Sequence, residues 1–132
     1  MSSAADRPTA TDFDAWLADM VRQHHEFTAL VVLAGIGHRQ VAPLCSTFLH
    51  VVGDDARWND FKAAFEGAGE AWDGAAFFPT KSRDGGLIDN ETARSRLAEL
   101  EARIRADRMV FNDGHFFNTD GQRIEIEPVL DA

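Results

Sequence analysis

The chain has 132 residues, the length of one domain, and can bury a hydrophobic core without disulfide bonds or a structural metal ion. Ten Phe and three Trp within a 45% apolar composition argue against intrinsic disorder. The formal net charge of -9 repels phosphate backbones and anionic lipid, so it disfavours nucleic acid and membrane surfaces as partners and favours a basic protein or a small molecule.

Cysteine usage and the apolar runs predict a cytoplasmic, reducing location. Cys45 is the single cysteine and cannot form an internal disulfide. No secretory signal pattern is present, and the longest purely apolar run, Ala29 to Ala34, is far shorter than the roughly 20 residues of a membrane-spanning helix. We expect a disordered tail over residues 1–10 and one globular domain over residues 11–130.

Three helices are predicted from apolar residues that recur every three to four positions. Each begins beside residues whose side chains can cap a helix: Thr11 or Asp12, Asp54 or Asp55, and Asp89 or Asn90. The expected buried stripes are Phe13, Trp16, Leu17, Met20, Val21 and His24 in the first helix, Trp58, Phe61 and Phe65 in the second, and Ala93, Leu97, Leu100 and Ile104 in the third.

Short apolar runs predict three strands between these helices. Ala29 to Ala34, closed by two glycines, has the composition of a central strand covered on both faces. Ser46 to Val52 predicts the second strand, and Ala75 to Phe78 predicts the third, which the following proline is expected to stop. Val41 to Cys45 contains Pro43, which would interrupt a helix, so this piece is predicted to be a loop or at most one turn of helix.

Two Asp-Gly pairs, Asp113-Gly114 and Asp120-Gly121, punctuate the segment that follows the third helix. Asp-Gly between apolar runs is a strong hairpin signal, because both central residues of a type I′ turn need positive φ. Two such turns predict a three-stranded meander. The expected fold class is therefore α+β, a single domain with about three helices packed on a mostly antiparallel sheet of five to six strands.

Phe116 and Phe117 lie between these two turns and are expected to point to opposite faces of one strand. One of them would then lie off the main core and, with His115, mark a surface for a protein partner or for self-association. The alternative is a helix that covers the second face of the strand. The pattern leaves both possibilities open.

Two short segments are candidates for ligand binding. Gly35-Ile36-Gly37 follows a strand as in a dinucleotide-binding fingerprint, but Gln40 stands where the third glycine belongs. The glycines are better explained by a tight exit from a buried strand. Lys81 and Arg83 form a basic island after the third predicted strand, where a loop can meet an anionic group.

No complete catalytic, metal-binding or cofactor-binding motif is present, so we expect no metal and no cofactor. The preferred interpretation is a small, acidic, non-enzymatic binding protein that engages a protein partner, with a basic one fitting best, through the meander and the loop from Lys81 to Gly86, or that self-associates as a homo-oligomer. The alternative is a small enzyme or a binder of small molecules or nucleotides. Its pocket would lie between Gly35 to His38 and the loop after the third strand, with His38 or His115 as a general base.

Overall fold

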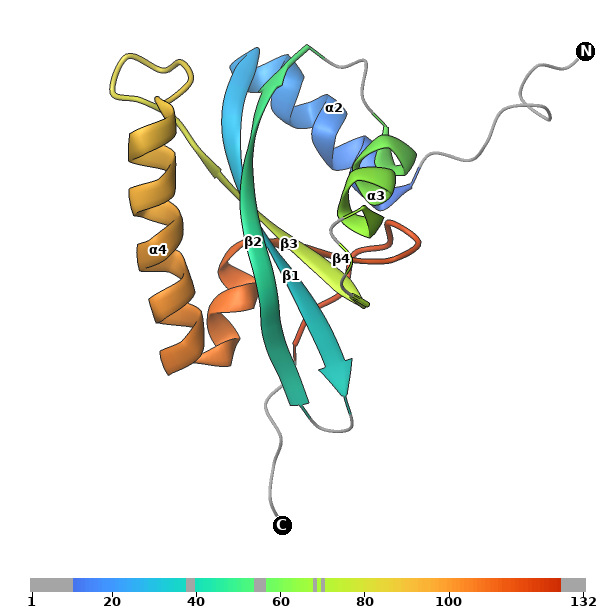
Figure 1. Cartoon of the computed structure of the whole chain (residues 1–132). Helices are drawn as coiled ribbons and strands as arrows, with labels where there is room; N and C mark the ends of the chain where they lie inside the picture. Colours follow the sequence, from blue (N-terminus) through green and yellow to red (C-terminus); the bar gives the residue numbers. More distant parts are fainter. Residues whose placement is uncertain (1–10, 38–39, 54–56, 68, 70, 127–132) are drawn as a thin grey trace, which may run out of the picture.

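The computed structural model describes residues 11–37, 40–53, 57–67, 69 and 71–126 and has an α+β fold (Figure 1). The expected tail, residues 1–10, lies outside this part. In chain order the elements are α2 (Asp12–His24), β1 (Glu26–Gly37), β2 (Gln40–Val52), α3 (Trp58–Glu66), β3 (Gly74–Thr80), α4 (Asn90–Ala106), the 3-10 helix η1 (Arg108–Asp113) and β4 (His115–Asn118). The described strands form one antiparallel sheet in the order β2-β1-β3-β4. The predicted class, with helices on an antiparallel sheet, is confirmed at this level.

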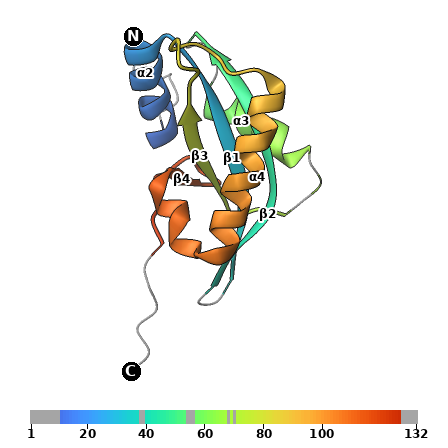
Figure 2. The same cartoon turned by 90° about the vertical axis from the view of Figure 1, so that its left-hand side faces the viewer.

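Both faces of the sheet are covered. Helices α2 and α3 lie on one face, and α4 and η1 lie on the other (Figures 1 and 2). Because successive side chains of a strand point to opposite faces, a central strand between two helical layers is buried throughout. The eight residues of β1 from Phe27 to Ala34 are all buried, which confirms the predicted central strand.

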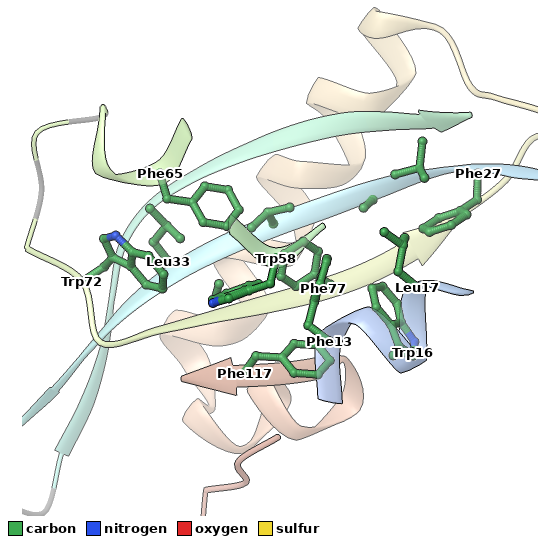
Figure 3. Packing of buried hydrophobic residues seen from close by; sticks show 14 residues of the cluster. Phe13, Trp16, Leu17, Phe27, Leu33, Trp58, Phe65, Trp72, Phe77 and Phe117 are labelled. Atoms are coloured by element: carbon green, nitrogen blue, oxygen red, sulfur yellow. The ribbon is translucent and has the colours of Figure 1, made fainter. Parts of the chain in front are cut away.

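An aromatic cluster fills the face toward α2 and α3 (Figure 3). The ring of Phe13 lies at its centre, 5.0 Å from Trp58, 4.9 Å from Phe77 and 5.2 Å from Phe117 between ring centroids. Tilted and edge-to-face pairs at such distances add about 0.5–1.5 kcal/mol each to the free energy of burial. The other large buried members are Trp16, Leu17, Phe27, Leu33, Phe65 and Trp72.

Aliphatic side chains fill the opposite face. The stripe predicted for the third helix is buried on α4, against Leu30 and Val32 of β1: Ala93, Leu97, Leu100 and Ile104. Phe111 of η1 stacks on Phe116 of β4 with ring centroids 5.2 Å apart. The sheet therefore separates two cores, one mainly aromatic and one mainly aliphatic.

Side-chain caps fix the starts of two helices. The Thr11 hydroxyl accepts a hydrogen bond from the Asp14 N–H (3.0 Å), and the Asp14 carboxylate accepts one from the Thr11 N–H (3.3 Å), which is a capping box. Asp89 accepts a hydrogen bond from the Thr92 N–H at 2.7 Å, and this bond lowers the pKa of Asp89. Two expected caps of the second helix lie outside the described residues: Asp54 and Asp55.

The segment after α4 does not form the predicted meander. Residues 108–113 form η1 instead of a strand, because Asp107 caps this 3-10 turn by accepting a hydrogen bond from the Met109 N–H at 3.0 Å. Gly114 has φ -99°, so the first Asp-Gly pair is not a type I′ turn. Glycine is needed here for space, since a Cβ would lie 2.8 Å from the carbonyl oxygen of Phe77.

The second Asp-Gly pair does form a turn. Gly121 has φ +77°, and its N–H donates to the Asn118 carbonyl at 3.0 Å. The chain then returns beside β4 through a single bridge between Phe117 and Arg123, not as a full strand. The described sheet therefore has four strands, and the expectation of five to six strands ending in a meander is corrected.

Both prolines near strands lie inside them. Residues 41–45, predicted to be a loop, belong to the thirteen-residue β2, and β3 continues past Pro79 to Thr80. Pro43 is tolerated because β2 is an outer strand, where a missing N–H costs no ladder hydrogen bond. The register passes from Leu33 opposite Cys45 to Ala34 opposite Pro43, so Leu44 is the extra residue of a β-bulge.

Candidate functional site

The outer edge of β2 is the least protected feature of the described sheet. Among the described residues, β2 pairs with β1 on one side only. Its sequence, QVAPLCSTFLHVV, contains no Asp, Glu, Lys or Arg. At the chain average of 27% charged residues, thirteen positions would hold about three or four charges, and outer strands usually carry them to prevent strand addition. An uncharged outer strand of this length therefore lacks one of the usual protections against strand addition.

The alternation of antiparallel hydrogen bonds indicates which backbone groups of β2 face outward. Pro79 has no N–H and lies opposite Ala29, so Ala29 directs its backbone groups toward β2 instead of β3. Its partner on β2, Leu49, therefore points its N–H and C=O toward β1. Alternate residues on β2 then point theirs to the outside: Ser46, Phe48 and His50.

Helix α4 borders the outer edge of β2 on the aliphatic face of the sheet. His50 Nε2 lies 2.9 Å from Asn90 Oδ1, and the guanidinium of Arg94 lies 5.8 Å from the ring centroid of Phe48. The Ser46 hydroxyl donates to the Glu101 carboxylate. One flank of α4 thus follows β2 along its length.

Arg108 shows that one outward backbone group of β2 is already used. Its Nε–H donates to the Val41 carbonyl at 2.9 Å, which closes the end of the edge next to the β1–β2 turn. The bulge at Leu44 and the missing N–H of Pro43 further limit this end. The part of the edge left for pairing is therefore the stretch from Ser46 to Val52, where Val52 is 67% exposed.

Phe116 and Phe117 are both buried, at 2% and 0% exposure. Phe117 packs in the aromatic core below α2, and Phe116 packs in the aliphatic core below α4 and η1. Both rings are therefore covered, as expected in the alternative in which a helix packs over the second face of the strand. The reason is that a helical layer lies on each face of β4.

His115, at the start of β4, contacts a cationic and an aromatic side chain. Arg123 Nη1 lies 3.2 Å from His115 Nδ1, and the Trp16 ring centroid lies 4.8 Å from that of the imidazole. Burial lowers the pKa of His115 below its ordinary value of 6.5, and the charge of Arg123 lowers it further. The imidazole is therefore neutral at pH 7, with Nδ1 as acceptor. Beside it is an open cavity of about 380 Å³ lined by Asp12, Ala15, Trp16, Asp19 and Arg123.

The other predicted ligand residues lie at opposite ends of β1. Gly35 and Gly37 line an open cavity of about 370 Å³ with Asp73, whose carboxylate accepts a hydrogen bond from the Ile36 N–H. The loop that contains Lys81 and Arg83 follows β3, and the antiparallel pairing of β3 places it at the beginning of β1. Lys81 Nζ lies 3.3 Å from His24 Nδ1, and Arg83 is exposed. A pocket shared by the two glycines and this loop does not form.

The remaining observations concern metals, membranes and related proteins. His38 lies outside the described residues. Within the described ranges, no three His, Cys, Asp or Glu side chains gather as they would around a metal ion. None of the described helices has the length and apolar character needed to cross a bilayer. No protein-family model, no curated protein and no solved structure matches the chain.

The sequence contained the signal for the β2 edge. A strand-like run with an internal proline indicates an outer strand. The absence of charge from Gln40 to Val52 indicates that this outer strand lacks charged side chains as a protection against pairing, although Pro43 protects one part of it. The α4 residues that border the edge, Arg94 and Glu101, could not be identified this way, because only the packing of α4 shows which flank meets β2.

Proposed function

We propose that this protein is a non-enzymatic binding protein that takes an extended segment of a protein chain onto the outer edge of β2. The observation that carries the proposal is the thirteen-residue outer strand without a charged side chain. In strand addition, main-chain hydrogen bonds supply affinity, and side chains on alternate positions supply specificity. The cytoplasmic location expected from the single cysteine remains part of this proposal.

The outward backbone groups of Ser46, Phe48 and His50 would form the new ladder. Antiparallel pairing places bonded residues of neighbouring strands about 5.5 Å apart. The exposed Val52 and the partly exposed Phe48 then offer apolar contact to the side chains of the incoming segment. An added strand would thus gain backbone hydrogen bonds and apolar burial together.

A matched pair of variants tests strand addition. Ser46→Pro removes the outward N–H and the hydroxyl, whereas Ser46→Ala removes the hydroxyl alone and so controls for the loss of the bond to Glu101. We expect complexes of the protein, measured by size-exclusion chromatography and pull-down, to be lost in the proline variant and kept in the alanine variant. Hydrogen exchange on the wild type should show the amides of Ser46, Phe48 and His50 protected in the complex and open in the free chain.

The proposal is wrong if the proline and alanine variants form complexes equally well while circular dichroism shows that both are folded. Unchanged exchange at the three outward amides on complex formation would remove it as well. Both results address β2 directly, so neither depends on knowing the partner.

A second candidate, a small-molecule binder or enzyme with a histidine base, is favoured by one observation. His115 is kept neutral beside an open cavity, and a neutral imidazole is the form that accepts a proton. A thermal-shift screen with nucleotides, acyl carriers and divalent cations tests it. Stabilisation by one ligand that is lost in His115→Gln supports this candidate, and a flat screen counts against it.

A further inference from the structure

We infer that the segment taken onto β2 carries an acidic side chain, Asp or Glu, at the position opposite Phe48, where Arg94 of α4 binds its carboxylate. This inference rests on the proposed strand addition. It goes further in naming the chemistry of the partner and in assigning Arg94 a part in its recognition.

The first argument is the face of the sheet on which the side chains of the partner lie. Phe48 packs against the aliphatic core below α4, and the next residue, Leu49, packs against the aromatic core. Residues that lie opposite each other on neighbouring strands point their side chains to the same face. A partner residue opposite Phe48 therefore points toward α4, whichever way the added strand runs.

The second argument is the distance from this position to Arg94. The guanidinium carbon of Arg94 lies 5.8 Å from the ring centroid of Phe48. Residues opposite each other on paired strands have Cβ atoms about 4.5–5.5 Å apart, so the partner residue is about as close to Phe48 as the guanidinium is. Both lie on the same face of the sheet. The long, exposed side chain of Arg94 can then turn its N–H groups to a carboxylate of the partner.

The third argument is that the charge of Arg94 is not compensated. Within the part of the chain that the structure describes, Arg94 lies within salt-bridge distance of no carboxylate. Glu101, the acidic residue of α4 that contacts β2, instead accepts a hydrogen bond from the Ser46 hydroxyl. The planar guanidinium of an arginine matches a carboxylate with two parallel hydrogen bonds. An acid at the added strand would therefore supply the partner that Arg94 lacks.

The fourth argument is the local net charge. Helix α4 carries four arginines and three glutamates, and β2 carries no charge, so these two elements together have a net charge of +1 within a chain of -9. Other surfaces of this chain therefore repel an acidic group more strongly than this one does. The net charge of the whole chain still favours a basic partner, because the inferred acid concerns a single position of the bound segment.

Phage-displayed random peptides of about nine residues, enough to span the stretch from Ser46 to Val52, test the inference. Selection on the wild-type protein should enrich peptides that share Asp or Glu at one position. Selection on Arg94→Glu should enrich Lys or Arg at that position instead. Selection on Ser46→Pro should enrich no common pattern.

One enriched peptide, synthesised with Glu, Gln or Lys at the shared position, gives the affinities by fluorescence polarisation. The wild type should bind the Lys peptide about fivefold or more weakly than the Glu peptide, because like charges replace opposite ones. Arg94→Glu should reverse this order for the same reason. The uncharged Gln peptide should bind the two proteins within about threefold of each other.

Arg103→Glu is the matched control, because it makes the same change of charge on the flank of α4 that borders β3. It should leave the preference for the Glu peptide unchanged. Binding of the Lys peptide by Arg94→Glu also shows that this variant is folded.

Three results would overturn the inference. Peptides that bind the wild type and Ser46→Ala but not Ser46→Pro, and that bind equally well with Glu and Lys, reject the acidic position and keep strand addition. No enrichment on the wild type, or equal binding to Ser46→Pro and Ser46→Ala, rejects strand addition and this inference with it. A preference for the Glu peptide that Arg94→Glu and Arg103→Glu alter equally rejects the assignment to Arg94.

Discussion

Replacing Phe117 with alanine separates the two interpretations of the doubled phenylalanine. The ring is 0% exposed and lies 5.2 Å from Phe13, 6.0 Å from Phe77 and 5.8 Å from Trp16 between ring centroids. The guanidinium carbon of Arg123 lies 4.9 Å from the ring centroid of Phe117. Truncating a buried Phe leaves a cavity and costs about 3–5 kcal/mol, a large share of the roughly 5–15 kcal/mol that stabilises a domain. Phe117→Ala is therefore expected to be a stability variant.

Urea unfolding followed by tryptophan fluorescence measures this change, because all three tryptophans belong to the same aromatic cluster. Protein concentration is held fixed, since self-association would add to the apparent stability. Leu44→Ala, at a residue 38% exposed on β2, serves as the control and should stay within about 0.5 kcal/mol of the wild type. A Phe117→Ala protein within about 1 kcal/mol of the wild type would refute the two-sided core and restore the ring as a surface residue.

Three further predictions concern single residues. Gly114→Ala should lower the free energy of unfolding in urea by about 1–3 kcal/mol, and Gly114→Asn should lower it further. The reason is that the Phe77 carbonyl leaves no space for a side chain, whereas the φ of Gly114 is not positive. A smaller loss in the Asn variant than in the Ala variant would contradict this. His115 has a lowered pKa, so the folded state binds fewer protons than the unfolded state. Its contribution to stability is present above about pH 6.5 and is lost as pH falls through the folded pKa. His115→Gln or Arg123→Gln should therefore make the free energy of unfolding depend less steeply on pH in this range. His25 has φ 65°, a conformation that glycine adopts without strain. His25→Gly should therefore raise the free energy of unfolding by about 1 kcal/mol and the melting temperature with it, whereas His25→Ala should raise neither.

Elements whose apolar period is long and regular were predictable from the sequence. The stripe of α4 and its Asp89 cap follow from spacing and capping chemistry, which act within a few residues and are fully present in the local sequence. The burial of β1 on both faces follows from its unbroken apolar run. These predictions depend on no contact between distant parts of the chain.

Elements that depend on distant contacts were not predictable. Asp113-Gly114 has the composition of a hairpin turn, but the space beside Phe77 decides the role of its glycine, and this neighbour lies on another strand. Pro43 breaks a helix or an inner strand, yet it fits an outer strand, and strand order is a tertiary property. The neighbours that surround His115 likewise lie on two other segments: Trp16 on α2 and Arg123 after β4.

The two edges of the sheet determine how many copies can associate. The edge of β4 is already occupied, because the Asn118 N–H donates to Gln122 and the Ile124 N–H donates to Phe116. The short end of β3 that extends past β4 contains Pro79, which offers no N–H for pairing. If two copies paired through β2 about a two-fold axis, they would use the open edge of both at once, and the described sheet would offer no equivalent edge to a third.

We therefore expect any self-association through β2 to stop at two chains. Sedimentation over a wide concentration range should show at most a single step from one to two chains, without the steady growth in mass that head-to-tail addition produces. Ser46→Pro should remove such a step, and Ser46→Ala should keep it. Continued growth beyond two chains would show that a second edge is open and that β2 pairs with a different surface.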